Sequence, residues 1–503
     1  MFAWFAAILA CSPDASVTPA GLPDRAPARV LLASIAPNSV SVDAAAPGDS
    51  WVDLDAPDDD RYGFRYRIID ASGEEIYRRT TSGPVVVESF LDYWSEQSGF
   101  DILGSLPTLG AFPIQLPLLD GAEVVRFDVR DASGEYVERG AFDLERLDSL
   151  ESHASDTVSG WETIRGGGPS ENRFDLVIVG DGFMEDELPA FRDAAEAVAD
   201  ALLAEEPFTS NADFLNIHRV DAVSAVSGAS YDCIDGCRPL DTAFDSIYAI
   251  EAVNAFTGST YDTRAIFQAD QWEVARAAGV VPWDAVLVIS NTTRFGGMAV
   301  HYATTTLYPG YPETAVHELG HSVGLLGDEY TGDFCVQTRS LGTPENIAED
   351  AANPPWAHHV DADTPLPTPD EGKYGNDVGA FAPAYNCEGL YRPQRHCMMN
   401  DYGPFCPVCA ELLTRRIYRF VDPADDVRLT ADGGTWELAF DAVREETVVV
   451  LVDGMEVATG TTAGLTFPRP RGAELTVRIQ AESSFVLADP NEDLVQERRW
   501  SLE

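Results

Sequence analysis

Apolar and polar positions alternate near the start of the chain. Residues 61–69 alternate with a period of two, a turn follows at Asp70-Ala71-Ser72-Gly73, and the pattern resumes at residue 75. The same order of strand and turn recurs at residues 124–134. Because successive side chains of a strand point to opposite faces of a sheet, this pattern predicts an antiparallel β-sandwich domain over residues 51–150.

A second series of short strands occupies the end of the chain. Asp422-Pro423 marks a boundary, and apolar segments separated by Gly- and Asp-rich turns follow it at 427–429, 435–440, 447–452 and 475–479. Short strands with frequent turns are typical of a sandwich. We therefore expect an immunoglobulin-like β domain over residues 425–503.

The middle of the chain has a different pattern. Residues 174–183 form an apolar run that ends at Gly, and residues 185–205 follow with apolar side chains at helical spacing. Further apolar runs at 215–220 and 285–289 predict buried strands. Strands that alternate with helices indicate a mixed α/β domain, here residues 165–420. The whole chain is thus predicted to be a multidomain α/β plus β protein, and His218, alone on its strand, is interpreted as structural.

Residues 296–306 precede the most conspicuous motif of the chain. This stretch combines glycines with β-branched residues, which favours an exposed strand at the edge of the sheet. An edge strand offers unpaired backbone groups to an extended peptide, so it predicts a place for a substrate. An ordinary sheet edge is the alternative.

The first residues predict export. An apolar run within residues 1–22 is too short to span a bilayer but fits the core of a signal peptide. Ile8-Leu9-Ala10-Cys11 resembles a bacterial lipoprotein cleavage box, in which Cys11 would be lipidated, although no basic residue precedes the run. Residues 23–50 are rich in Pro, Ala and Ser and are predicted to be a linker. The expected location is the cell envelope or the extracellular medium, and any membrane attachment would be through lipid.

The net charge argues against one class of partner. Against 33 Lys and Arg stand 83 Asp and Glu, which gives −50 at pH 7. Such a surface repels phosphate backbones, so nucleic acid is excluded as an expected partner. The acidic stretches Asp58-Asp59-Asp60 and Asp422 to Asp426 are candidates for calcium, although neither has a defined ligand spacing.

Seven of the eight cysteines lie between residues 233 and 409. In an exported protein, this clustering predicts disulfides that brace the loops of a site. The alternative is a structural zinc site, because Cys406-Pro407-Val408-Cys409 has the tight spacing of such sites. Its ligands would be Cys387, Cys397, Cys406 and Cys409.

Residues 317–321 read His-Glu-Leu-Gly-His and carry the strongest chemical signal in the chain. In a helix, residues four apart share a face, so His317 and His321 can offer two nitrogens to one metal ion. Glu318 lies beside them and can accept a proton from water. Two imidazoles, an open position and a carboxylate base are what a hydrolytic zinc site needs.

A catalytic zinc usually has three protein ligands, so one more is required. A continuous helix would carry later residues away from His317, whereas a turn at Gly324 would return the segment 327–330 to the metal. Asp328 is the preferred third ligand and Glu329 the alternative within this segment. Glutamates from later in the chain are further candidates, namely Glu345, Glu349 and Glu388.

The motif through Asp328-Glu329-Tyr330 resembles the signature of the IgA-peptidase metallopeptidase family, a metzincin-like group of secreted bacterial zinc peptidases. The resemblance extends to residues 179–183, 206–208, 389–393 and 405–409, and so covers about 170–420. It implies a metzincin-like fold with an active-site helix and a methionine beneath the metal, for which Met399 is the candidate. Tyr402 resembles in position a tyrosine that some metzincins place near the metal. Metzincins usually place the third ligand ten residues after the first His, which here is Gly327.

These features predict an exported zinc metallopeptidase, with an endopeptidase as the expected type, that hydrolyses peptide bonds with Glu318 as general base. The partner expected is a protein or peptide substrate, while the oligomeric state is left open. One alternative is an inert binding or adhesion protein at the cell surface on a peptidase fold. Another is a zinc amidase that acts on cell-wall peptides.

Overall fold

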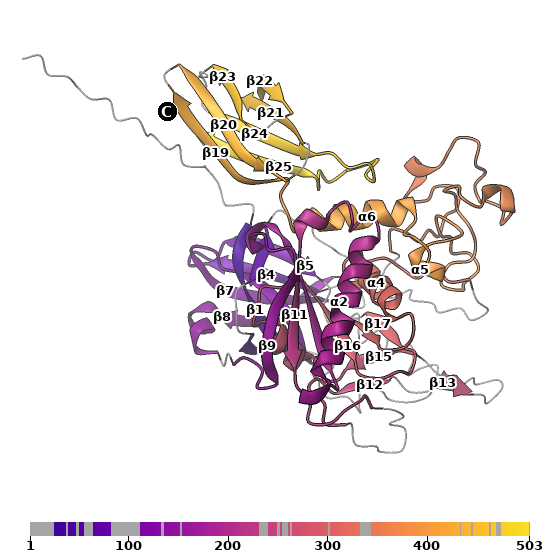
Figure 1. The fold of residues 1–503 in the computed structure, drawn as a ribbon. Helices are drawn as coiled ribbons and strands as arrows, with labels where there is room; N and C mark the ends of the chain where they lie inside the picture. The colour runs from indigo at the N-terminus through magenta and orange to yellow at the C-terminus, as the bar shows by residue number, and fades with distance from the viewer. Residues whose placement is uncertain are drawn as a thin grey trace, which may run out of the picture. The chain divides into compact units, whose positions relative to one another are not determined.

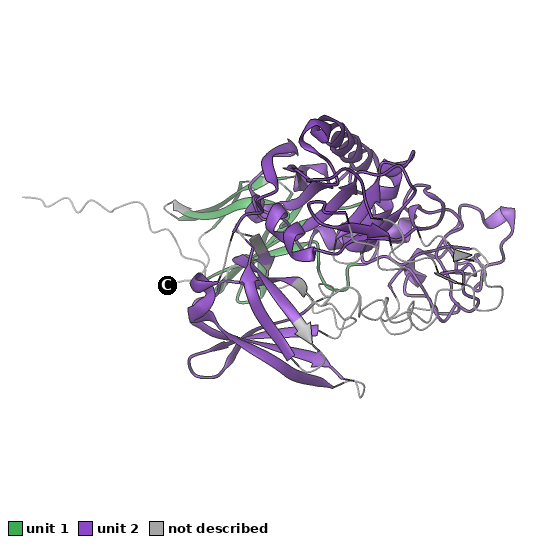
Figure 2. Ribbon diagram, turned by 90° about the horizontal axis from the view of Figure 1, so that it is seen from below, with its two compact units in different colours: residues 1–23, 422–484, 489–503 green, residues 24–421, 485–488 purple. Residues whose placement is uncertain are grey.

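The computed structural model describes most of the chain (Figure 1), and it does so in the following ranges: 25–36, 39–46, 50–54, 64–81, 111–131, 135–150, 153–230, 240–248, 252–253, 260–261, 264–299, 302–331, 344–432, 434–443, 446–461, 464–468 and 474–501. The predicted signal segment 1–22 with Cys11 lies outside these residues, as do Asp58-Asp59-Asp60. The chain divides into two compact units, which Figure 2 distinguishes by colour. One comprises residues 24–421 and 485–488, and the other the C-terminal residues 422–484 and 489–503.

Two antiparallel sheets form the N-terminal part of the larger unit. In the first, β1 pairs with β2, β3 and β6, and the second has the order β5-β4-β7-β8. The inward side chains of both sheets share one core, as the alternating pattern predicts. The strands are β1 (Arg25–Ala36), β2 (Ser39–Ala45), β3 (Ser50–Asp53), β4 (Phe64–Asp70), β5 (Glu75–Thr81), β6 (Ala111–Pro117), β7 (Ala122–Arg130) and β8 (Tyr136–Asp143).

The predicted linker over residues 23–50 is wrong for most of its length, because β1 and β2 lie within it. Leu31 packs in the core of the sandwich, whereas Val30 and Leu32 pack in a second core with the central sheet. A strand that is buried on both faces has a continuous apolar run and no alternation. Without alternation, nothing in this stretch indicated a strand. The surrounding Pro, Ala and Ser residues therefore led to the prediction of a linker.

A mixed six-stranded sheet forms the centre of the same unit, in the order β17-β18-β16-β10-β11-β9. The four inner strands are parallel, while β9 and β17 pair antiparallel at the two edges. The bounds are β9 (Val158–Arg165), β10 (Phe174–Asp181), β11 (Leu215–Ala222), β16 (Ala285–Ser290), β17 (Gly297–Ala299) and β18 (Ala303–Thr306). Two further small sheets pair β12 (Ser246–Tyr248) with β15 (Ile266–Gln268) and β13 (Ala252–Val253) with β14 (Thr260–Tyr261).

Helices cover both faces of this sheet. Val177 and Val179 of β10 pack in one core with helix α3 (Gln271–Ala278). Gly180 points to the other face, where a side chain at this position would collide with Phe191 of helix α2 (Leu188–Ala204). Helix α4 (Tyr311–Ser322) contacts α2, β17 and β18. The prediction of a multidomain α/β plus β protein, with a mixed sheet and antiparallel β domains, is confirmed at this level.

His218 is buried on β11, as expected of a structural residue. Its Nε2 lies 2.9 Å from Asp175 Oδ1, and its Nδ1 lies 2.9 Å from Thr163 Oγ1. Both ring nitrogens therefore have partners within the sheet.

The C-terminal unit contains two antiparallel sheets around one core, with the orders β19-β20-β23 and β22-β21-β24-β25. The strands are β19 (Ala424–Asp432), β20 (Thr435–Ala442), β21 (Glu446–Val452), β22 (Met455–Gly460), β23 (Leu465–Pro468), β24 (Glu474–Ala481) and β25 (Val495–Ser501). Asp422 pairs with Arg498 and Asp426 with Arg428, so these carboxylates are used in ion pairs and do not support the predicted calcium site. Nowhere in the described part of the chain is a helix long and apolar enough to cross a membrane.

Candidate active site and metal centre

Helix α4 carries the two histidines of the motif. It begins after Gly310, which has a φ of 95°, and has Pro312 in its first turn, where no backbone donor is needed. His317 and Glu318 are buried. The ring centroids of His317 and His321 lie 4.9 Å apart, so the helical spacing places both imidazoles on one side of the helix.

The chain reverses direction directly after α4, but not in the predicted way. The residue with a left-handed backbone is Leu325, with a φ of 51°, and not Gly324. Gly324 is needed for close packing instead, since a Cβ there would lie 2.7 Å from both the Gly320 carbonyl oxygen and Leu413 Cδ2. The reversal returns residues 326–330 to the side of the helix that carries the histidines.

Asp328 meets both histidines after this reversal. Its Oδ1 lies 3.3 Å from His317 Nε2 and 3.3 Å from His321 Nε2. The three ligand atoms all lie within 4.8 Å of one another. Ligands bound tetrahedrally at about 2.0–2.1 Å from one ion lie about 3.3–3.4 Å apart, so the spacing fits zinc.

The other nitrogen of each imidazole is occupied by a backbone carbonyl. His317 Nδ1 lies 2.8 Å from the carbonyl oxygen of Met398, and His321 Nδ1 lies 2.7 Å from that of Leu326. Only a protonated Nδ1 can donate to a carbonyl, so each Nε2 presents a lone pair. Asp328 Oδ1 is buried and makes no hydrogen bond to any described residue. Two imidazole nitrogens and one carboxylate oxygen thus converge, and a cation bound there would take the place of the proton that His321 otherwise shares with Asp328.

The charges of His317, His321 and Asp328 shift the pKa values of these side chains. Burial alone would raise the pKa of Asp328, but the neighbouring His321 and His317 outweigh burial and lower it below its usual range. Burial would also lower the pKa of His321, and Asp328 reverses this and raises it to about 9. The site therefore favours positive charge next to Asp328.

The side chain of Glu318 extends from α4 towards the edge of the central sheet. A Cβ added to Gly297 of β17 would lie 2.4 Å from Glu318 Oε1, so the carboxylate packs directly against this strand. Burial raises the pKa of Glu318. Of the stretch 296–306, which was predicted to be one exposed edge strand, only β17 lies at an edge of the sheet, while β18 is a buried inner strand. The candidate base is therefore a neighbour of the part of this stretch that lies at the edge.

Two tyrosines approach His317. The ring of the predicted Tyr402 lies 5.4 Å from the imidazole, and this residue ends the short helix α5 (Met398–Asp401). Tyr330 stacks on His317 with an interplanar angle of 7°, and its hydroxyl lies 3.1 Å from Nε2. Sequence reasoning overlooked Tyr330 as a site residue. Its position two residues after Asp328 was the available signal, since alternate residues of an extended segment share a side.

Met399, the predicted methionine beneath the metal, is fully buried. A Cβ at Gly320 would lie 2.6 Å from its sulfur, so Met399 packs against the helix between the two histidines. The backbone N–H of Glu329 donates to the Met399 carbonyl at 2.8 Å. The segment that supplies Met398 and Met399 therefore supports both the helix and the segment that returns after it.

Comparison with known families agrees with this geometry. Residues 163–374 match the family model described as IgA Peptidase M64. This part of the chain is thus similar to the IgA peptidase M64 family. No curated protein sequence matches the chain. The M64 match includes α4, Asp328 and Glu329, while Met399 and Tyr402 lie beyond its end.

Glu329 of the M64 segment, the alternative third ligand, does not join the histidines. It forms a separate group with Cys397, Cys406 and Cys409, all of them buried. These three cysteines have free thiols, so the expected disulfides are not supported for them. The predicted zinc alternative contained Cys387, and the structure places Glu329 in that position instead. Glu345, Glu349 and Glu388 belong to neither group.

A third cluster lies at the end of the M64 match. His358 Nε2 lies 2.7 Å from Glu411 Oε1, and His359 Nε2 lies 3.1 Å from Oε2. The backbone N–H groups of Leu487 and Ala488 also donate to Oε2. Both oxygens of the Glu411 carboxylate thus have partners within the protein, so this carboxylate needs no metal ion to balance its charge.

Proposed function

We propose that the chain is a zinc-dependent peptidase that hydrolyses peptide bonds at the group His317, His321 and Asp328. The observation that carries the proposal is the convergence of the two histidines on Asp328, whose Oδ1 lies 3.3 Å from His317 Nε2 and 3.3 Å from His321 Nε2. This convergence lies within a segment that matches a peptidase family. Three protein ligands leave one position of a tetrahedral ion open, as in catalytic zinc sites.

A zinc ion held there would supply a Lewis acid and would lower the pKa of water towards 7. The chain's own residues perform the remaining steps. The carbonyls of Met398 and Leu326 hold the imidazoles in the tautomer that presents Nε2. Glu318 accepts a proton from water and transfers it to the leaving amine. Burial raises the pKa of Glu318, which favours holding the proton taken from water until that proton is transferred to the leaving amine.

The two tyrosines would act on the substrate carbonyl. The Tyr330 hydroxyl lies 3.1 Å from His317 Nε2, and the ring of Tyr402 lies 5.4 Å from the same imidazole. Hydroxyl donors aimed at the developing oxyanion stabilise the transition state. We assign Tyr330 the leading role, because its hydroxyl lies next to His317 Nε2 whereas Tyr402 is an exposed side chain.

The substrate would bind as an extended peptide along β17. This strand is the edge of the central sheet, and its Gly297 touches Glu318. A peptide that pairs with an edge strand is aligned by backbone hydrogen bonds. The scissile bond would then lie beside the base, which supports the endopeptidase type and the metzincin-like mode of action. Nothing in this site selects immunoglobulin.

Two rival functions remain open to test, an inert binding protein and an amidase that acts on cell-wall peptides. The presence of Glu318 favours an enzyme over the first. Export, with Cys11 as a lipid attachment site, stays part of the proposal and rests on the sequence of residues 1–22.

The deciding experiment compares the full chain with Glu318→Gln on a mixed library of unfolded proteins, with peptidoglycan peptides in parallel. We expect cleavage of proteins by the wild type and a loss on the order of 10²–10⁴-fold in the variant with metal content unchanged. Glu313→Gln is the matched control, since Glu313 is an exposed residue of the same helix. A wild type that binds zinc but cuts neither substrate would favour the binding protein.

A further inference from the structure

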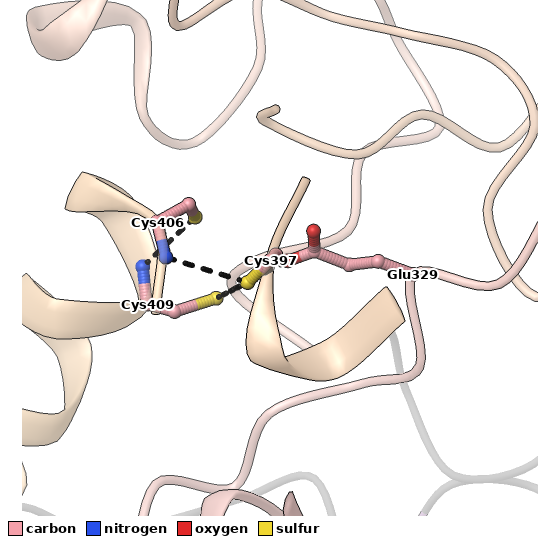
Figure 3. A group of neighbouring side chains, drawn as sticks. All are labelled: Glu329, Cys397, Cys406 and Cys409. Carbon is pink, nitrogen blue, oxygen red and sulfur yellow. Dashed lines mark hydrogen bonds between the residues drawn. The ribbon is translucent and has the colours of Figure 1, made fainter. Parts of the chain in front are cut away.

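Glu329, Cys397, Cys406 and Cys409 converge on one point although they come from three separate segments of the chain (Figure 3). Their ligand atoms all lie within 4.8 Å of one another, and all four residues are buried. The mechanism proposed above uses none of these side chains. Three thiols and a carboxylate in one buried place require an explanation of their own.

The spacing is that of metal ligands. Cys397 Sγ and Cys409 Sγ lie 3.7 Å apart, and Cys409 Sγ lies 3.1 Å from Glu329 Oε1. Thiolates bound tetrahedrally to zinc at about 2.3 Å lie about 3.8 Å apart. A disulfide would instead bring the two sulfurs to about 2.05 Å. The distance between Cys397 Sγ and Cys409 Sγ is therefore close to the distance expected between two thiolates bound to one zinc ion.

The backbone around the thiols stabilises negative sulfur. The N–H of Cys406 donates to Cys397 Sγ at 3.4 Å, and the N–H of Cys409 donates to Cys406 Sγ at 3.5 Å. Cys406 is the N-cap of helix α6 (Pro407–Ile417), where the helix dipole favours a thiolate. Thiolates are the form in which cysteine binds metal.

Glu329 supplies a second, independent observation. Its Oε1 accepts hydrogen bonds from Asn346 Nδ2 and Cys409 Sγ. Its Oε2 is buried and has no partner among the described residues. A buried carboxylate oxygen without a partner is costly, and a cation within the group would remove that cost.

We propose that these four residues bind a second zinc ion, which is structural and separate from the catalytic one. Thiolate-rich donor sets select soft or borderline metals such as zinc, and four protein ligands close the tetrahedron to water. The proposal rests on this geometry and does not depend on peptidase activity.

The second ion would hold the catalytic group in place. Glu329 follows Asp328 directly, and its N–H donates to the Met399 carbonyl. Cys397 precedes Met398, whose carbonyl accepts from His317. An ion bound at the thiols therefore fixes both the segment that carries Asp328 and the segment that orients His317.

Metal counting on the purified full chain tests this proposal. We expect two zinc ions per chain in the wild type and one in the double variant His317→Ala/His321→Ala. Replacement of zinc by cobalt in that double variant should give thiolate-to-cobalt charge-transfer absorption, which the imidazole and carboxylate group cannot produce. Adding Cys406→Ser and Cys409→Ser should abolish the absorption and the remaining metal. Glu345→Gln, an exposed carboxylate near the site, is the control that should retain two ions.

The outcomes separate the two proposals. A double histidine variant without metal, or a disulfide between Cys397 and Cys409 found by mass spectrometry in protein purified under reducing conditions, would overturn the second site. If the cysteine variants do not fold, native thiol titration of the wild type replaces them, with three protected thiols that react only after chelation as the supporting result. Two bound ions without any proteolysis would support the second site while contradicting the peptidase.

Discussion

Asp328 and Glu329 are adjacent carboxylates that enter two groups of different chemistry. Asp328 joins two imidazoles in a three-ligand group, which leaves room for water. Glu329 joins three thiols in a four-ligand group, which leaves none. The number and softness of the partners, and not the carboxylate itself, separate a site suited to hydrolysis from one suited to structure.

The two groups also depend on each other through the backbone. Successive side chains of an extended segment point to opposite sides, so one short segment can serve both groups. The Met398 and Met399 carbonyls connect this segment and α4 to the same short helix. Damage to the thiol group is therefore expected to weaken the catalytic group, which the following variants examine.

The largest effect is expected in the variant Asp328→Ala, which is compared with Glu329→Ala. Asp328→Ala should remove one of the two metal ions and lower kcat/KM on the order of 10³-fold, because a ligand of the reacting metal is lost. Glu329→Ala should weaken the other ion and lower kcat/KM by roughly 10–100-fold through misplacement of Asp328. Metal analysis and peptide-cleavage kinetics measure both. Equal metal loss in the two variants would mean that the groups are not distinct.

Tyr330→Phe should have the next largest effect. Removal of a hydroxyl that donates in the transition state lowers kcat by roughly 10²-fold and changes KM little. Steady-state kinetics on one peptide separate the two constants, with Tyr402→Phe in parallel. A larger loss in the Tyr402 variant would exchange the roles of the two tyrosines.

Gly320→Ala examines the contact between α4 and the methionine segment. The new Cβ would lie 2.6 Å from the sulfur of Met399, and overpacking of this kind costs about 1–3 kcal/mol. We expect a lower unfolding midpoint in denaturant, and a smaller loss of stability when Gly320→Ala is made in a Met399→Ala background, where the Cβ has room. An equal loss in both backgrounds would show that the collision lies elsewhere.

The smallest effect concerns the cluster of His358, His359 and Glu411. We expect this cluster to bind protons and not a metal ion. Burial would raise the pKa of Glu411, but hydrogen bonds from His359 and His358 outweigh it and lower the pKa to about 2. Because the folded pKa is depressed, the stabilisation is complete above about pH 4.5 and is lost as the pH falls from there towards 2. After allowance for solvent screening, it amounts to roughly 1–2 kcal/mol.

Glu411→Gln should remove this acid-dependent part of the free energy of unfolding. Denaturant titrations between pH 3 and pH 7 measure it, with Glu371→Gln as a control on an exposed carboxylate. A chelator should leave the difference between wild type and Glu411→Gln unchanged. If chelation abolished that difference, this cluster would be a metal site like the other two.

Local chemistry accounts for what could be predicted from the sequence. The alternation of residues 61–69 and the helical spacing of His317 and His321 depend on neighbours within a few positions, so β-sandwich strands and a two-histidine helix follow from them. The linker prediction for residues 23–50 failed because a strand buried on both faces carries no alternation.

The sequence by itself determined that His317, Glu318 and His321 share one helix, and from this it predicted the class of chemistry. Only the tertiary structure decided which carboxylate faces the histidines, because that depends on the reversal at Leu325 and on the Met399 segment, which lies far along the chain. It also decided that the fourth member of the thiol group is Glu329, whereas the sequence had predicted Cys387. Spacing within a helix is set by the backbone repeat, whereas contacts between distant segments are set by packing, which no local pattern records.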